Sequence, residues 1–300
     1  MPGCNQQLRT AFPDLLSFLM SFRTLIEPTA LAELLAQDGT VAVVDCRFEL
    51  ADPSAGERAY QAAHIPGAVY AHLDRDLSGP KTGTNGRHPL PDAATLARTL
   101  GHLGVGTNQQ VVAYDQDSGM FASRFWWLLR WLGHDKVAVL DGGFAAWAAG
   151  GRPSDSGVDT RPPAVFEGQP RPGMLASVDE LPAFVGAPGT KLVDARAPER
   201  FRGDIEPLDR VAGHIPGATN HFFQWNLAHG RFLAPDALRQ RLRESVGETE
   251  GSRIVCYCGS GVTACHNLLA LEHAGISGAR LYPGSWSEWC ADPARPVAKG

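Results

Sequence analysis

One cysteine of the chain stands in a context that could make it a nucleophile. It is Cys258, the first residue of the stretch Cys258-Gly259-Ser260-Gly261-Val262-Thr263-Ala264. The apolar run 253–257 before it predicts a buried strand, and 266–274 after it predicts a helix. The two glycines allow backbone N–H groups to point at one spot, where the helix N-terminus adds partial positive charge. Such a turn favours an anion, so we expect Cys258 to be a thiolate, the nucleophilic form of cysteine.

The elements that must position this turn occur twice in the chain. The first half contains four segments that recur in the second half in the same order: 43–47, 63–68, 111–115 and 140–147 match 192–196, 213–218, 254–258 and 282–289. Four such matches at similar spacing indicate a tandem duplication. Each half alternates β-branched runs with helical patterns, which favours a parallel sheet covered by helices on both faces. Asp115 occupies the position of Cys258 in the first half, so only the second half has the nucleophile.

The Cys258 stretch resembles the active-site loop of the mercaptopyruvate sulfurtransferases, a group within the rhodanese superfamily. All seven positions from 258 to 264 agree with that loop. The related thiosulfate sulfurtransferases usually carry Arg-Lys where this chain has Gly259 and Ser260. The resemblance implies an α/β fold with tandem rhodanese-like domains, which face each other across a cleft.

The duplication and the local composition divide the chain into four parts. We predict an N-terminal extension at 1–21, a rhodanese-like domain without a nucleophile at 22–153, a linker at 154–173 and a catalytic rhodanese domain at 174–300. The linker is rich in Pro, Gly, Asp and Arg, which are typical of loops. The extension lacks the features of a signal peptide, so we assign it no role. Ser177 and Glu180 form a capping-box pattern that predicts the start of a helix.

Two residues of the first half gain a role from the resemblance. His88 lies in a proline-rich loop without a counterpart in the second half, and Asp74 follows the first His-Ile-Pro-Gly-Ala turn. In the mercaptopyruvate sulfurtransferases an aspartate and a histidine at matching places are thought to join the loop serine in a proton relay. This implies that Asp74, His88 and Ser260 act together with Cys258, because an oriented neutral imidazole carries protons near neutral pH. Asp76 is an alternative to Asp74, and the alternative for His88 is an exposed loop histidine.

A keto acid substrate also needs a partner for its carboxylate, and arginine supplies a two-pronged donor. The family uses one arginine from an Arg-Phe-Arg-Gly stretch and another shortly before the second Gly-His-Ile-Pro-Gly turn. The resemblance therefore implies Arg200 and Arg210 as substrate-binding residues. The alternative for both is an ion pair with Asp204, Glu206 or Asp209.

Other conspicuous residues have plainer explanations. His64 and His214 occur at the same place in both halves, although only one half has a nucleophile, so we expect them to form turns. The tryptophans within 126–131 have helical spacing and predict a core or a domain interface. Cys256 and Cys265 are expected to be buried and unreactive.

Composition excludes several classes of protein. A chain of 300 residues with 44% hydrophobic content can form two domains with cores. A net charge of −5 argues against nucleic-acid and membrane-surface partners. Six scattered cysteines have no metal-ligand spacing and no disulfide framework, so we expect reduced thiols, a cytoplasmic location and no metal or organic cofactor. No apolar run approaches the roughly 18 residues of a membrane span.

The mechanism implied by the resemblance is a double displacement. The Cys258 thiolate attacks the sulfur of 3-mercaptopyruvate, and pyruvate leaves as its enolate. Backbone N–H groups of the loop hold the anionic sulfur, which makes Gly259, Gly261, Val262 and Thr263 substrate-binding residues. A thiol acceptor such as a thioredoxin-like protein, or cyanide, then takes the outer sulfur from the Cys258 persulfide.

Three other functions are alternatives. The nearest is a thiosulfate sulfurtransferase, which differs only in its donor. A non-catalytic sulfur-binding or sensing module is disfavoured by the intact loop together with Arg200 and His88. A cysteine phosphatase needs an arginine that closes the loop, whereas this loop ends in Val262-Thr263-Ala264-Cys265.

Overall fold

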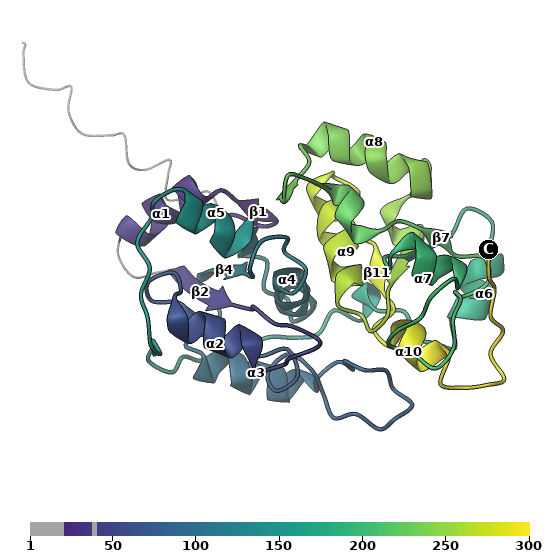
Figure 1. The fold of residues 1–300 in the computed structure, drawn as a ribbon, viewed down its shortest axis with the longest axis horizontal. Coiled ribbons are helices and arrows are strands. Elements are labelled where there is room, and N and C mark those ends of the chain that lie inside the picture. Colours follow the sequence, from purple (N-terminus) through teal and green to yellow (C-terminus); the bar gives the residue numbers. More distant parts are fainter. Residues whose placement is uncertain (1–20, 38–40) are drawn as a thin grey trace, which may run out of the picture.

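The computed structural model describes residues 21–37 and 41–300. The predicted extension at 1–21, apart from its last residue, and Cys4 therefore lie outside the described residues. The two halves of the sequence form two sheets with their own helices, which lie side by side in Figure 1. None of the helices within the described ranges is long and apolar enough to span a membrane.

The first half is built on a five-stranded sheet with the order β1-β5-β4-β2-β3, in which every neighbouring pair is parallel. Its strands are β1 (Leu25–Ile26), β2 (Val41–Asp45), β3 (Val69–Tyr70), β4 (Gln110–Tyr114) and β5 (Val137–Leu140). The apolar side chains of β2 alternate between two separate clusters, and all of its residues are buried. The sheet is therefore covered on both faces, as parallel sheets are.

Five helices within the described part of the first half cover the two faces of this sheet. They are α1 (Pro28–Ala36), α2 (Ala55–Ala62), α3 (Ala93–His102), α4 (Ala122–Trp131) and α5 (Gly143–Ala149). Leu31 of α1 and Trp147 of α5 belong to the cluster on one face. Leu96 of α3 and Phe125 of α4 belong to the cluster on the other face.

The second half repeats this arrangement with a four-stranded parallel sheet of order β11-β10-β6-β7. Its strands are β6 (Lys191–Asp194), β7 (Thr219–Asn220), β10 (Ile254–Tyr257) and β11 (Arg280–Leu281). The other strands are β8 (Leu227–Ala228) and β9 (Arg231–Phe232), which form an antiparallel pair. The expected fold, two α/β units with parallel sheets, is thus confirmed.

Helices also cover both faces of the second sheet. The α-helices are α6 (Leu181–Gly186), α7 (Pro198–Arg202), α8 (Pro235–Val246), α9 (Thr263–His273) and α10 (Ser285–Trp289), and the 3₁₀ helices are η2 (Pro172–Met174), η3 (Phe223–Asn226) and η4 (Gly251–Arg253). Leu181 of α6 and Trp286 of α10 pack on one face. Leu238 of α8 and Leu269 of α9 pack on the other.

The predicted helix start, with Ser177 as the N-cap, is wrong by three residues, because the N-cap is Glu180. The Glu180 carboxylate does accept a hydrogen bond from the Ser177 N–H at 2.6 Å, as in a capping box. The α-helix nevertheless begins at Leu181, with a proline in its first two positions. Proline is favoured at a helix start because it has no N–H to satisfy, which places the boundary later than the polar pattern suggests.

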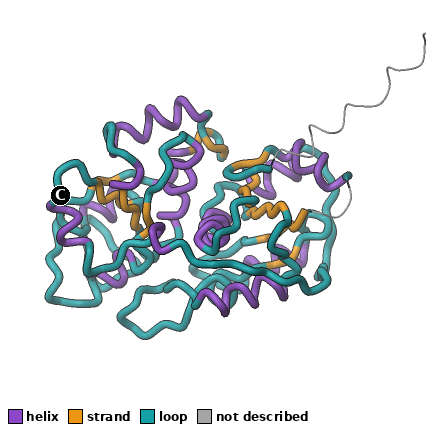
Figure 2. Tube along the Cα trace, turned by 180° about the vertical axis from the view of Figure 1, so that it is seen from behind, coloured by secondary structure: helices purple, strands orange, loops and turns teal. Residues whose placement is uncertain are grey.

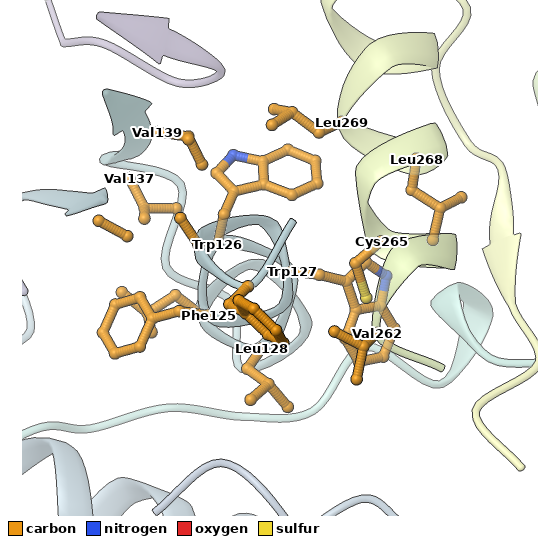
Figure 3. Packing of buried hydrophobic residues seen from close by; sticks show 14 of the residues in the cluster. Phe125, Trp126, Trp127, Leu128, Val137, Val139, Val262, Cys265, Leu268 and Leu269 are labelled. Atoms are coloured by element: carbon orange, nitrogen blue, oxygen red, sulfur yellow. The ribbon is translucent and has the colours of Figure 1, made fainter. Parts of the chain in front are cut away.

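The two halves share one apolar core. Helix α4 packs against α9, and the cluster on the inner face of the first sheet continues onto the second. Figure 3 shows Trp126 and Trp127 pointing from α4 toward the side chains of α9. The tryptophans of 126–131 therefore build both a domain core and the interface, as predicted.

The linker 154–173 lies along the first half and is almost entirely loop, drawn in teal in Figure 2. The Ala164 N–H donates to the Gly101 carbonyl at 2.9 Å, and Arg171 pairs with Asp135 at 2.7 Å. The chain then enters the second half, where Leu175 pairs with Leu281. The linker is thus bound to one domain instead of hanging free between the two.

The paired histidines have the structural role expected of them. His64 Nδ1 lies 2.8 Å from the Tyr60 carbonyl, and the two rings stack with centroids 4.2 Å apart. His214 repeats both contacts with Phe201, at 2.7 Å and 3.8 Å. Each histidine fixes the turn that follows it.

Candidate active site

The Cys258 loop forms the expected cup around the sulfur. Cys258 follows β10 and is 2% exposed. Its Sγ accepts hydrogen bonds from the N–H groups of Ser260 at 3.4 Å and Gly261 at 3.1 Å. Gly261 has φ +78°, and a Cβ there would lie 2.5 Å from the Pro283 carbonyl oxygen. Only glycine fits this position, so the close approach of the backbone to the sulfur depends on it.

The start of α10 holds the loop from outside. The Trp286 N–H donates to the Cys258 carbonyl at 2.9 Å, and the Ser287 N–H donates to the Gly259 carbonyl at 3.0 Å. The Cys258 N–H in turn donates to Ser285 Oγ at 3.1 Å. Ser285 has φ +55°, unusual for a residue other than glycine, and its hydroxyl bond offsets that strain. Sequence reasoning missed Ser285, although it lies in the repeated 282–289 segment.

The remaining predicted loop residues have different surroundings. The Val262 side chain is buried in the shared apolar core, and Thr263 is the first residue of α9. Gly259 lies against arginines, since a Cβ there would meet Arg87 Nη2 at 2.7 Å and Arg200 Nη2 at 3.6 Å. The predicted roles of Gly259, Val262 and Thr263 in holding substrate stay predictions.

The three residues expected to carry a proton come together from both halves. His88 is 4% exposed, which excludes an exposed loop histidine. Its Nδ1 lies 2.7 Å from Ser260 Oγ, and its Nε2 lies 3.6 Å from Asp74 Oδ1. The Asp76 carboxylate instead accepts the His72 N–H at 2.7 Å, so the geometry favours Asp74 as the partner.

Burial decides the charge of His88. Desolvation lowers the pKa of this imidazole to about 3, despite the opposing effect of Asp74. The ring is therefore neutral near neutral pH. With its Nε2–H toward Asp74, its Nδ1 is free to accept the proton of the Ser260 hydroxyl.

Two arginines reach the loop, and one of them was not predicted. Arg200 pairs with Glu206 at 2.6 Å and with Asp209 at 3.5 Å. Arg87, from the first half, pairs with the other oxygen of Asp209. Two of the three carboxylates expected as alternative partners of Arg200 are thus in contact with it, and their side chains are buried. The third, Asp204, pairs with Arg202. The signal for Arg87 was its place beside His88 in the same loop.

The structure does not bring Arg210 to the loop. Its side chain is exposed, and no ion pair or side-chain hydrogen bond found among residues 21–37 and 41–300 involves it. A role for Arg210 in binding substrate stays a prediction.

The neighbouring cysteines are buried, as expected. Burial raises the pKa of the Cys256 thiol, and it raises the pKa of the Cys265 thiol to about 12. Cys265 Sγ donates to the Gly261 carbonyl at 3.3 Å, so this thiol keeps its proton. In the part of the chain that the structure describes, no cluster of His, Cys, Asp or Glu could hold a metal ion.

This site and fold match a known family. The rhodanese-like domain model matches residues 27–150 and again 177–292. The chain belongs to the rhodanese-like family, with two copies of the domain, as the sequence predicted.

The relatives named in the comparisons are sulfurtransferases. The chain is 52% identical, over 94% of its length and all of the relative's, to a probable 3-mercaptopyruvate sulfurtransferase of Pseudomonas aeruginosa. It is 40% identical, over 93% of its length and 98% of the relative's, to a putative thiosulfate sulfurtransferase of Mycobacterium tuberculosis. Among solved structures it resembles the 3-mercaptopyruvate sulfurtransferase from Leishmania major, with a TM-score of 0.78 and 31% identity over 89% of this chain and 74% of that one.

Proposed function

We propose that the chain is a sulfurtransferase that moves the sulfane sulfur of 3-mercaptopyruvate to an acceptor through a persulfide on Cys258. The names of its relatives support sulfur transfer, and the relative at 52% identity carries the name of this donor. The observation that carries the choice of donor is the contact of 2.7 Å between His88 Nδ1 and Ser260 Oγ at the rim of the sulfur cup.

The contact matters because the two donors differ in their leaving groups. Attack of the Cys258 thiolate on the substrate sulfur forms an S–S bond and breaks the C–S bond. The bonding pair goes to carbon and gives the enolate of pyruvate, which must gain the proton that the substrate thiol loses. Ser260, His88 and Asp74 form a path for that proton, and the neutral imidazole is in the correct state to relay it.

The substrate carboxylate binds beside Gly259 in this proposal. Arg200 is the residue expected from the sequence, and Arg87 joins it because both guanidinium groups border the same glycine. In the structure these arginines form ion pairs with Glu206 and Asp209. The substrate carboxylate must therefore share the guanidinium groups with these side chains or displace the side chains from them.

The second half of the reaction passes the outer sulfur to an acceptor. We propose a thiol, such as that of a thioredoxin-like protein in the cytoplasm, or cyanide. The first step leaves the persulfide on Cys258, whose inner sulfur accepts hydrogen bonds from the N–H groups of Ser260 and Gly261.

Thiosulfate is the second candidate donor. The relative at 40% identity is named for it, and two guanidinium groups beside the loop could bind its charges. Its sulfite leaving group departs without a proton, so the relay would have no task. The decisive measurement is kcat/KM for pyruvate release from mercaptopyruvate beside kcat/KM for sulfite release from thiosulfate. A preference for thiosulfate in wild type would reject the proposed donor.

A variant of the relay tests the mechanism. His88→Ala should lower mercaptopyruvate turnover by roughly 10²–10⁴-fold, the usual contribution of general acid–base catalysis, and lower thiosulfate turnover less. Asp74→Asn should follow the same pattern more weakly. Asp76→Asn is its matched control, because that carboxylate binds the His72 N–H instead. Equal losses with both donors in His88→Ala would mean that His88 is only structural.

A further inference from the structure

Arg124 is a buried cation without a carboxylate partner. Three arginines are buried within the described residues, namely Arg47, Arg124 and Arg196. Arg47 pairs with Asp45 at 2.6 Å, and Arg196 pairs with Asp194 at 2.7 Å. Arg124 is fully buried in α4, and none of the ion pairs found in the described ranges involves it. An uncompensated buried charge is costly, so Arg124 needs an anion from elsewhere.

Its contacts lead to the active site. Arg124 Nη1 donates to the Gly261 carbonyl at 3.1 Å, and Nη2 donates to the carbonyls of His88 at 3.2 Å and Leu77 at 3.5 Å. One guanidinium group from the first half therefore joins the proton-relay loop to the nucleophile loop. Its buried Nε has no hydrogen-bond partner among the described residues, so the charge is not fully satisfied by carbonyl dipoles.

Two sulfur atoms lie at the residue whose carbonyl Arg124 binds. Cys265 Sγ donates to the same Gly261 carbonyl at 3.3 Å, and Cys258 Sγ accepts the Gly261 N–H at 3.1 Å. Cys265 faces an acceptor, the Gly261 carbonyl, which favours its neutral thiol. Cys258 faces two N–H donors, which favour an anion.

The other ionisable groups around Cys258 do not compete for this role. His88 is neutral, and burial also keeps the Cys256 thiol protonated. Arg87 and Arg200 are already occupied by the carboxylate of Asp209. Asp74 is directed to His88 and Lys81.

We propose that Arg124 is the counter-ion of the Cys258 thiolate and of its persulfide, and that it positions the His88 loop against the nucleophile. The inference rests on the proposed function only in taking Cys258 as the nucleophile. The domain without a nucleophile thus supplies positive charge to a loop whose own side chains are neutral. Arg124 acts through the loop and is a positioning residue.

The charge is tested by alkylation of Cys258 with iodoacetamide, followed by mass spectrometry of the peptide. Arg124→Gln should slow alkylation by about tenfold or more at about pH 6.5, where only the thiolate fraction reacts. At about pH 10, where a thiol is ionised in any case, the rate should stay within about threefold of wild type. Arg130→Gln is the matched control on the same helix, because Arg130 pairs with Glu272 instead.

Arg124→Lys separates charge from geometry. It keeps the charge but cannot bridge two carbonyls with a planar fork, so alkylation at about pH 6.5 should stay within about threefold while mercaptopyruvate turnover falls about tenfold. Wild-type alkylation at that pH in a folded Arg124→Gln protein would overturn the proposal. No donor is needed for this readout, so it is independent of which donor the enzyme uses.

A fixed anion gives a test that holds even if Arg124→Gln fails to fold. Cys258→Asp places a carboxylate in the cup, and with Arg124 beside it the protein should unfold at no lower temperature than Cys258→Ser. Cys256→Asp is the control and should be strongly destabilised, because the position is buried and no ion pair or hydrogen bond found in the described ranges brings a cation to it. A melting temperature of Cys258→Asp more than about 5 °C below that of Cys258→Ser would also overturn the proposal.

Discussion

The loop at Asp115 and the loop at Cys258 occupy equivalent places in the two halves of the chain. Each follows a parallel strand, β4 or β10, and precedes a helix of the shared core. The Phe144 N–H donates to the Asp115 carbonyl at 2.9 Å, as the Trp286 N–H does to the Cys258 carbonyl. The backbone supports of the two loops are therefore alike.

The two loops differ in what fills the cup. In the first half the Asp115 carboxylate accepts three backbone hydrogen bonds, from Gly119 at 2.9 Å, Phe121 at 2.8 Å and Ala122 at 3.2 Å. In the second half the cup holds a sulfur atom that can bond to another sulfur. The same fold thus places a carboxylate in the cup of one half and a thiol group in the cup of the other. The backbone N–H groups that point into the cup therefore belong to the scaffold, and one side chain decides which chemistry the loop can do.

The support beneath each loop carries a second difference. Gly143 has φ +57° and the equivalent Ser285 has φ +55°. A Cβ at Gly143 would lie 2.6 Å from the Asp115 carbonyl oxygen, so a serine there would force the backbone to move. In the catalytic half the serine is accommodated, and its hydroxyl holds the Cys258 N–H.

The largest expected effect is loss of the reactive side chain. Cys258→Ser should abolish sulfur transfer, while Cys256→Ser and Cys265→Ser keep most of it, because only Cys258 faces the N–H groups of the cup. After donor treatment, mass spectrometry should find one added sulfur on Cys258. Asp115→Cys in the Cys258→Ser protein should stay inactive, since the contact of His88 with Ser260 and the arginines beside Gly259 belong to the Cys258 loop. Added sulfur on Cys256 would contradict the assignment.

A smaller effect is expected when the arginines beside the reactive loop are released. Asp209→Asn removes the carboxylate that both Arg87 and Arg200 contact. It should raise kcat/KM for thiosulfate by about tenfold and raise the mercaptopyruvate value less, because thiosulfate carries the larger charge. Asp204→Asn is the control, since Asp204 pairs with the exposed Arg202. An unchanged ratio between donors would mean that these arginines do not select the donor.

The Asp115 carboxylate should matter for stability alone. Asp115→Ala leaves three buried N–H groups without an acceptor and should lower the free energy of unfolding by about 1–3 kcal/mol. Chemical denaturation measures the loss. Turnover of the folded variant should stay within about threefold of wild type, and a larger loss would show that the first loop also serves catalysis.

The smallest expected effect concerns pH, because His88 should not change its protonation state between about pH 5 and 8. The pKa of His88 falls to about 3 in the folded protein, against about 6.5 when it is exposed, so His88 is neutral above about pH 5. Its turnover contribution should therefore be constant from about pH 5 to 8. Because the unfolded chain binds this proton more tightly, His88 lowers stability as pH falls from about 6.5 to 3, and it adds no pH dependence above that window. An inflection near pH 6.5 in the plot of turnover against pH, absent in His88→Gln, would contradict a neutral His88.

Much of the fold and the nucleophile could be predicted from the sequence because their signals are local. The duplicated segments, the alternation of strands with helices and the glycines of the Cys258 turn all lie within short windows. The strand before Cys258 was expected at 253–257 and spans Ile254–Tyr257. The helix after it begins at Thr263, three residues earlier than expected, because the turn itself supplies its first residues. The resemblance to a known loop then pointed to His88, Asp74 and Arg200.

Tertiary structure alone decided how the two halves complete one site. The contact between His88 and Ser260 joins residues 172 positions apart, and no pattern in either window states it. Arg124 appeared in the sequence only as a charge within a helix of apolar residues. Its role depends on its burial and on the carbonyls that its guanidinium group binds, Gly261 in the second half and Leu77 and His88 in the first. An arginine in water needs no partner, whereas an arginine buried in an interface between domains is costly without an anion nearby. The sequence does not state that Arg124 is buried, because its burial follows from the packing of α4 against α9.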